Sequence, residues 1–292
     1  MIIQKYHTSE EINQELLHIH NNYEDFTTFR TLGNSHDNRP VSLLRIGLGI
    51  ETIVMTAGFH GKEDLNPLLL LKLAESYAKA YADNLEMNKY PVRKLLNQCS
   101  VTILPLLNPD GYEIAHNGFQ SISNPILRQM CKMRGIESEN WQYNARGVDL
   151  NGNFPCQTYE PAQLGEYPSS EQETRMLMRV FEEYDTRGYL NFYSNEKIVC
   201  YYRPEHRIAP FSFRCQMKRF PYRLRNKNNN MWKPGENGES GSPAAYYTQL
   251  IGNLAFCIET VDNYRQNPLT LEQTSLEIQH IPLEIIKKMK SF

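Results

Sequence analysis

The feature that most constrains the fold is an uninterrupted apolar run, TIVMTAGF at residues 52–59, that leads directly into His60-Gly61-Lys62-Glu63. A run of strand length without polar alternation is typical of a strand buried on both faces, as in parallel sheets. A second run of this kind, SVTILPLL at residues 100–107, ends in the chain breaker Asn-Pro-Asp-Gly. Between the two runs, apolar residues recur at helical spacing over about residues 65–85. Strand, helix and strand in this order predict a parallel sheet covered by helices.

The remaining sequence extends this pattern. It predicts helices over about 9–23, over 169–184 with a Ser cap and a capping box, over 244–252, and from about 270. It predicts a hairpin over 26–48 and strands at 189–195, 197–203 and 254–260, whereas 115–165 is expected to be an ordered, irregular and functional loop region. The predicted fold class is α/β, a mixed and mostly parallel twisted sheet with helices on both faces, forming a single domain over residues 1–292. Ligands of such sheets bind beyond the carboxyl ends of the strands.

Charge and composition exclude several classes of protein. The chain has 31 Lys+Arg against 33 Asp+Glu, so its net charge gives no overall electrostatic case for binding nucleic acid or an acidic membrane. No apolar run approaches the roughly 20 residues that span a bilayer, so no membrane partner is expected. The basic aromatic stretch at 213–227 is interpreted as a solvated face rather than a phosphate-binding surface. The six cysteines form no tight pair and no secretory leader is recognisable, which favours free thiols over disulfides and a cytoplasmic location.

Three features carry potential chemistry. His60 and Glu63 are three residues apart on a turn that enters a helix, so they can hold one metal ion, although many such pairs are only surface neighbours. The loop RGVDLNGNFP, residues 146–155, can present amide donors or be an ordinary Asx-rich turn. Glu259 closes an apolar strand, which suits a general base but also a structural ion pair.

Together and in this order, these features resemble the zinc carboxypeptidase family. The resemblance covers nearly the whole chain and includes the N-P-D-G-Y-E sequence from Asn108 to Glu113. The segment RGVDLNGNFP followed by GEYPSSEQET looks most like the bacterial branch that cleaves γ-D-glutamyl–diamino acid bonds in cell-wall peptides. The resemblance implies one catalytic zinc ion, held by His60, Glu63 and a later His, with a position left for water. It also implies Glu259 as the general base and Asn151 as the group that binds the terminal carboxylate of a peptide substrate.

The sequence departs from the family at three positions. The position of the third zinc ligand holds Tyr193, and a phenol with an unperturbed pKa near 10 is a poor zinc ligand at neutral pH. Neither His116 nor His206 replaces it. Gln142 stands where the family has a cation for the oxyanion, and a neutral amide stabilises that charge less. Gly152 stands where an Arg usually grips a carboxylate.

Two further questions stay open in the sequence. Arg146 or Arg134 are candidates to compensate for the missing cation. The tyrosine that contacts substrate in the family is expected between residues 222 and 247, where Tyr222, Tyr246 and Tyr247 compete.

Two hypotheses therefore compete. The first is a metallopeptidase of the carboxypeptidase type that hydrolyses a peptide or a cell-wall peptide. The second is a catalytically impaired relative that binds such a peptide without turnover. Retention of the two metal-ligand candidates, the base and the asparagine favours the first, whereas Tyr193 favours the second.

Overall fold

The computed structural model describes residues 8–157, 159–161, 167–194, 197–202, 219, 233–235, 241–260, 267 and 269–289. The helix at the start, α1 (Ser9–Asn22), begins as the sequence predicts, with a capping box between Thr8 and Glu11. Its buried positions, among them Ile12 and Leu16, face the helix that follows the first buried strand.

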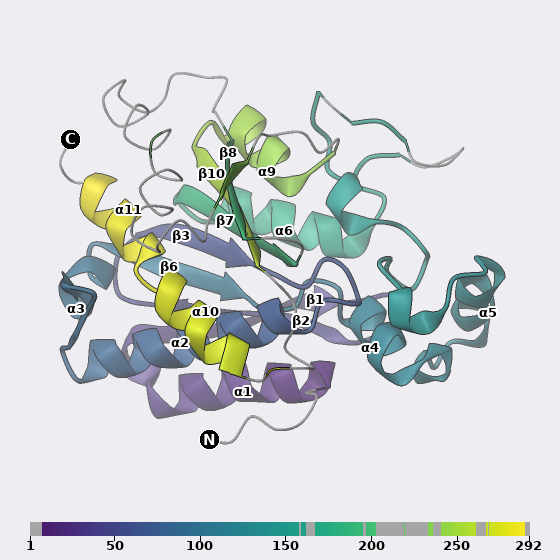
Figure 1. Ribbon diagram of the computed structural model, residues 1–292, viewed down its shortest axis with the longest axis horizontal. Helices are drawn as coiled ribbons and strands as arrows, with labels where there is room; N and C mark the ends of the chain where they lie inside the picture. The colour runs from purple at the N-terminus through teal and green to yellow at the C-terminus, as the bar shows by residue number, and fades with distance from the viewer. Residues whose placement is uncertain are drawn as a thin grey trace.

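An eight-stranded mixed sheet forms the centre (Figure 1). Its order is β1 (Thr27–Asn34), β2 (Pro40–Ile46), β6 (Cys99–Leu104), β3 (Glu51–Thr56), β7 (Thr186–Ser194), β10 (Leu254–Thr260), β8 (Ile198–Tyr202) and β9 (Lys233–Gly235). The four central strands, β6, β3, β7 and β10, run parallel, whereas β2 and β8 pair antiparallel on either side of them. The carboxyl ends of the central strands therefore share one edge, where an α/β sheet places its ligand. A two-stranded sheet, β4 (Glu86–Met87) with β5 (Tyr90–Pro91), is separate.

Helices cover both faces of the sheet (Figure 1). One face carries α1, α2 (Leu65–Ala82), α3 (Val92–Leu96), α10 (Leu269–Ile278) and α11 (Ile281–Met289), and the other carries α6 (Gln172–Glu183) and α9 (Pro243–Tyr246). The helices α4 (Pro109–Asn117) and α5 (Pro125–Met133) lie beyond the end of β1 and β2. Single turns complete the set: Glu24–Phe26, Phe119–Ser121, Ser138–Asn140 and Leu150–Gly152 as 3-10 turns, and Tyr247–Ile251 as a π turn.

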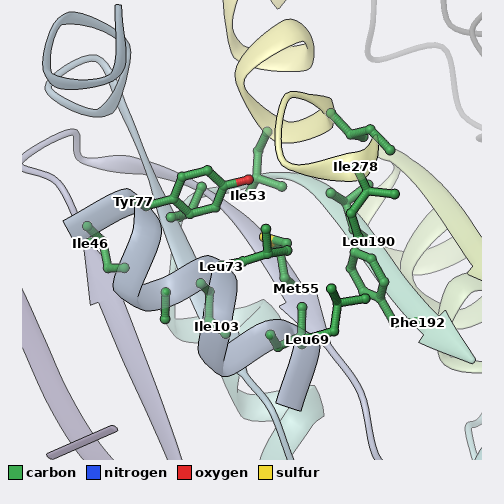
Figure 2. Packing of buried hydrophobic residues seen from close by; sticks show 14 of the residues in the cluster. Ile46, Ile53, Met55, Leu69, Leu73, Tyr77, Ile103, Leu190, Phe192 and Ile278 are labelled. Carbon is green, nitrogen blue, oxygen red and sulfur yellow. The ribbon is translucent and has the colours of Figure 1, made fainter. Parts of the chain in front are cut away.

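The first apolar run packs on both faces, as predicted. Ile53 and Met55 point into the layer of α2, where they meet Leu69 and Leu73 (Figure 2). Val54 between them belongs to the opposite layer, with the side chains of α6 and α9. Alternating strand residues therefore pack into different layers. The two threonines of the strand, Thr52 and Thr56, are buried as well, and their hydroxyls are hydrogen-bonded to neighbouring strands.

Three local predictions need correction. The predicted C-terminal helix is two helices, because Pro282 lies at the start of α11 and cannot continue α10. The region 115–165 contains the end of α4 and all of α5, which begins at the cap Asn124 and its following proline. The capping box of α6 is absent, since the cap is Glu171 and makes no side-chain cap bond.

The cysteines and the apolar helices can be compared with the expectations from composition. No disulfide joins any two of the five cysteines in the described ranges, and Cys215 lies outside them. None of the helices found in those ranges has the length and apolarity that crossing a membrane requires.

Candidate active site

The predicted site residues converge at the carboxyl edge of the parallel strands. His60 and Glu63 follow β3, Tyr193 lies near the end of β7, and Glu259 lies near the end of β10. Glu259 pairs in register with Tyr193, so these two side chains project from the same face of the sheet. Residues that are far apart in sequence are brought to one edge by the sheet topology alone.

His60 and Glu63 have the separation of two ligands to one ion. Nδ1 of His60 lies 3.2 Å from Oε1 of Glu63. Two atoms bound tetrahedrally to zinc at its usual bond lengths lie about 3.4 Å apart. The backbone N–H of Ser194 donates to the same Glu63 oxygen at 3.2 Å, so the end of β7 fixes the carboxylate, which is almost fully buried.

The other nitrogen of His60 faces a carboxylate that the sequence analysis did not assign to the site. Nε2 of His60 lies 3.5 Å from Oδ1 of Asp149. A carboxylate on the far nitrogen of a histidine ligand sets its tautomer and orientation, and is the usual partner of such a ligand. The sequence did mark this carboxylate, because Asp149 is the first residue of the Asp-Leu-Asn motif. Burial acts to lower the pKa of His60, but its hydrogen bonds to Asp149 and Glu63 outweigh burial and raise the pKa to about 10. The surroundings of His60 therefore stabilise positive charge on the imidazole.

Tyr193 is tied to the asparagine that the resemblance assigns to substrate binding. Its hydroxyl donates to Oδ1 of Asn151 and accepts from Nδ2 of Asn191, and all three side chains are buried. Its ring lies 5.7 Å from the ring of His60, between centroids. The structure thus brings Tyr193, Asn151 and His60 together.

A glycine allows the neighbouring loop to approach the metal-ligand turn. A Cβ on Gly61 would lie 2.1 Å from the carbonyl oxygen of Gly111 and 2.9 Å from that of Trp141, so only glycine fits. This contact places the backbone of Trp141, which precedes the partly exposed Gln142, against Gly61.

The loop of Asn151 is packed in a similar way. A Cβ on Gly241 would lie 2.3 Å from the carbonyl oxygen of Gly152, and Gly241 has a φ of +66°. The backbone N–H of Phe154 donates to the carbonyl of Gly241 at 2.9 Å. The start of α9 therefore holds the loop that contains Asn151 and Gly152. The roles expected for Gln142 and Gly152 toward substrate stay predictions.

Asn66 is a second residue that the sequence analysis missed. It lies fully buried in the first turn of α2. Its Nδ2 donates to Oγ of Ser194 and its Oδ1 accepts from Oγ1 of Thr260, both at 2.9 Å. One amide thus joins the ends of β7 and β10 to the helix that follows His60. In the sequence, Asn66 could have been noticed as a polar residue within the leucine-rich start of this helix.

Two of the three candidate substrate tyrosines belong to the core. Tyr246 and Tyr247 are buried and pack against Phe181, and burial raises the pKa of both phenols. Tyr222 lies outside the described residues. Neither Tyr246 nor Tyr247 is therefore placed to contact substrate.

The alternative ligands and cations have other partners. His116 bonds to Asp64 and stacks on Tyr112, and His206 lies outside the described residues. Within the described ranges, no third His, Cys, Asp or Glu completes a metal site with His60 and Glu63.

The two candidate arginines lie on other groups. Nη1 of Arg146 pairs with Oε1 of Glu171 at 3.0 Å. The guanidinium of Arg134 lies over the ring of Tyr143, 4.6 Å from its centroid.

A His–Glu pair that follows a parallel strand, with a carboxylate behind the histidine, has the arrangement of two metal ligands and an outer carboxylate partner. The chain belongs to the zinc carboxypeptidase family, whose sequence profile matches residues 12–267.

Individual relatives agree with this assignment. The chain is 26% identical to carboxypeptidase A2 of Mus musculus over 220 residues, which cover 72% of this chain and 48% of that protein. It is 29% identical to γ-D-glutamyl-L-diamino acid endopeptidase 1 of Lysinibacillus sphaericus over 128 residues, 43% of this chain and 32% of that one. The chain thus spans about half the length of the curated relatives it matches, or less. The fold is also that of bovine thrombin-activatable fibrinolysis inhibitor in complex with tick carboxypeptidase inhibitor, with a TM-score of 0.71 and 17% identity over 97% of this chain and 98% of that chain.

Proposed function

We propose that this chain is a zinc-dependent hydrolase of the carboxypeptidase type that cleaves a peptide bond or a γ-D-glutamyl amide bond. The observation that carries the proposal is His60, held between Glu63 and Asp149 at the end of a parallel strand. The similarity to a γ-D-glutamyl-L-diamino acid endopeptidase supports a cell-wall peptide as the substrate.

Two of the expected ligands fit zinc. The separation of His60 Nδ1 and Glu63 Oε1 matches one edge of a zinc tetrahedron, and Asp149 provides the customary outer partner. The third position holds the phenol of Tyr193, which is hydrogen-bonded to two asparagines. We therefore infer that zinc is bound by His60 and Glu63 with a weak or absent third protein ligand. When bound, zinc lowers the pKa of a water molecule and polarises the scissile carbonyl.

The chain's own residues perform the remaining steps. Glu259 accepts the proton that the attacking water loses and passes it to the leaving amine nitrogen. The side-chain amide of Asn151 binds the terminal carboxylate of the substrate. Gln142 donates a hydrogen bond to the oxygen that gains charge, without a formal positive charge of its own. Gly152 leaves space where an arginine would otherwise hold an α-carboxylate, which suits a substrate that places its carboxylates elsewhere.

The decisive experiment is the zinc content of the purified protein and of a Tyr193→His variant. We expect less than one zinc per chain in the wild type and close to one in Tyr193→His, with hydrolysis gained or increased. Full occupancy in the wild type that is lost in Tyr193→Phe would instead identify the phenolate as a ligand.

A panel of substrates tests the specificity. Peptides with C-terminal Lys or Phe and a γ-D-glutamyl–diaminopimelate peptide distinguish carboxypeptidase from cell-wall peptidase activity. Binding of these peptides with no hydrolysis, in both the wild type and Tyr193→His loaded with zinc, would support the non-catalytic alternative, which the family match itself does not favour.

A further inference from the structure

A second group of potential metal ligands lies apart from the strand-end site. His36 from the turn between β1 and β2 meets Glu171 and Glu173 at the start of α6, and their ligand atoms all lie within 4.8 Å of one another. Nε2 of His36 is 3.0 Å from Oε2 of Glu171 and 3.7 Å from Oε2 of Glu173. These separations bracket the edge of about 3.4 Å that zinc ligands show in a tetrahedral site.

Glu173 is the observation that calls for a ligand. Its side chain is fully buried, and neither carboxylate oxygen has a hydrogen-bond partner in any other residue of the described ranges. An unsatisfied buried carboxylate is strongly unfavourable, since it loses its hydration without replacement. Burial raises the pKa of Glu173 to about 7, but a protonated acid would still lack an acceptor for its O–H.

A proton on His36 cannot satisfy both carboxylates. Nε2 carries at most one hydrogen, and at 3.0 Å that hydrogen is directed to Glu171, while 3.7 Å to Glu173 is beyond hydrogen-bond distance. A metal ion in the place of this proton binds all three groups at once. His36 is the partly exposed member, with 19% of its side chain accessible, so it provides a route for the ion.

The groups around the cluster hold its ligands in place. Although burial opposes ionisation, hydrogen bonds from His36, Asn144 and Ser170 keep the pKa of Glu171 at about 2. Arg146 binds the other oxygen of Glu171 from the rim of the cluster and is partly exposed. With His36 neutral, as a metal ligand must be, two carboxylates face one guanidinium and the cluster stays negative.

We propose that His36, Glu171 and Glu173 bind a second divalent transition-metal ion, with Zn²⁺ as the ion that suits one imidazole and two carboxylates. Three oxygen or nitrogen donors are too few for calcium, which takes six to eight oxygens. The ion is structural. It joins the β1–β2 turn to α6, and through Asn144, which bonds to Oε2 of Glu171, to the loop that leads to Asp149.

The experiment isolates this site from the strand-end pair. A His60→Ala/Glu63→Gln variant is stripped with a chelator and dialysed against Zn²⁺, and the bound metal is counted by mass spectrometry. We expect about one zinc per chain, and none when Glu173→Gln is added to the same background. Zinc should raise the thermal midpoint of the parent variant and leave that of the Glu173→Gln version unchanged.

A second variant guards against misfolding. His36→Asn changes a partly exposed side chain, and it should also abolish zinc binding while the circular dichroism spectrum stays that of the parent. A His60→Ala/Glu63→Gln protein that binds no zinc, or a Glu173→Gln version that binds as much as its parent, would overturn the proposal. Because the strand-end pair is removed in every sample, these results do not depend on the proposed hydrolysis.

Discussion

Asn66 allows a sharp test of how the strand-end site is held together. In Asn66→Leu, a side chain of similar volume replaces the amide, so little cavity forms and the main loss is two hydrogen bonds, to Ser194 and Thr260. Each neutral bond contributes about 1 kcal/mol net, which gives a loss of about 2 kcal/mol in the free energy of unfolding. With an m-value of about 3 kcal/mol/M, the urea midpoint should fall by about 0.7 M.

The same change should reduce hydrolysis more than stability alone explains. Ser194 donates its backbone N–H to Glu63, so releasing its side chain from Asn66 loosens the position of this proposed zinc ligand. Loss of an outer partner of a metal ligand typically reduces metal affinity or activity by about 10- to 100-fold. We expect at least the lower value, measured under conditions where the variant is fully folded.

Asn253→Leu is the matched control. Asn253 donates to the carbonyl of Thr186 at 2.7 Å, so it joins the same two strands, β7 and β10, at their amino ends, away from the site. This variant should lose about 1 kcal/mol of stability and keep its hydrolysis rate. The reasoning is refuted if Asn66→Leu unfolds at the wild-type urea concentration, or if both variants lose hydrolysis equally.

Three further predictions concern the site and its surroundings. Asp149→Asn should lower zinc affinity by about 10-fold or more in equilibrium dialysis with little change in the unfolding midpoint, because the amide no longer provides a charged acceptor for His60; unchanged affinity would remove Asp149 from the site. Gly61→Ala forces a Cβ to 2.1 Å from the carbonyl oxygen of Gly111, so it should cost at least about 2 kcal/mol in urea unfolding, and a wild-type midpoint would contradict the close approach. Burial raises the pKa of the Cys131 thiol to about 11, so at pH 8 iodoacetamide should modify the partly exposed Cys156 well before Cys131, as peptide mass spectrometry will show; equal labelling would be inconsistent with this burial.

The central sheet and the position of His60 and Glu63 at its edge were predictable because their sequence signals are local. The apolar run 52–59 required a strand between two dry layers, and a His–Glu turn that follows such a strand lies at the ligand edge of the sheet. The place of Glu259 near the end of an apolar strand was predictable for the same reason, whereas its role as a base stays a prediction. The register that sets it beside Tyr193 came only with the structure.

The features that the sequence analysis missed depend on contacts between distant segments. The Asp-Leu-Asn motif marks Asp149, but its contact with His60 joins segments that are distant in sequence, and no local pattern encodes that contact. The capping box predicted for α6 failed because the hydroxyl of Ser170 donates to the carboxylate of Glu171 instead.

Tyr246 and Tyr247 were retained as substrate candidates since helical periodicity does not tell which layer a short helix fills. The structure shows that both belong to the core between α9 and α6.

The sheet order has a consequence for the newly synthesised chain. The ribosome delivers β7 and β8 before β10, yet in the finished sheet β10 lies between them. Until residues 254–260 emerge, β7 and β8 each present an edge of unpaired N–H and C=O groups, which is the kind of surface that aggregates. The strand that closes this gap also carries Glu259 and Thr260. Closing the gap in the sheet and bringing Glu259, the proposed base, to the site are therefore one event, so a chain that still exposes these edges lacks Glu259 at its site.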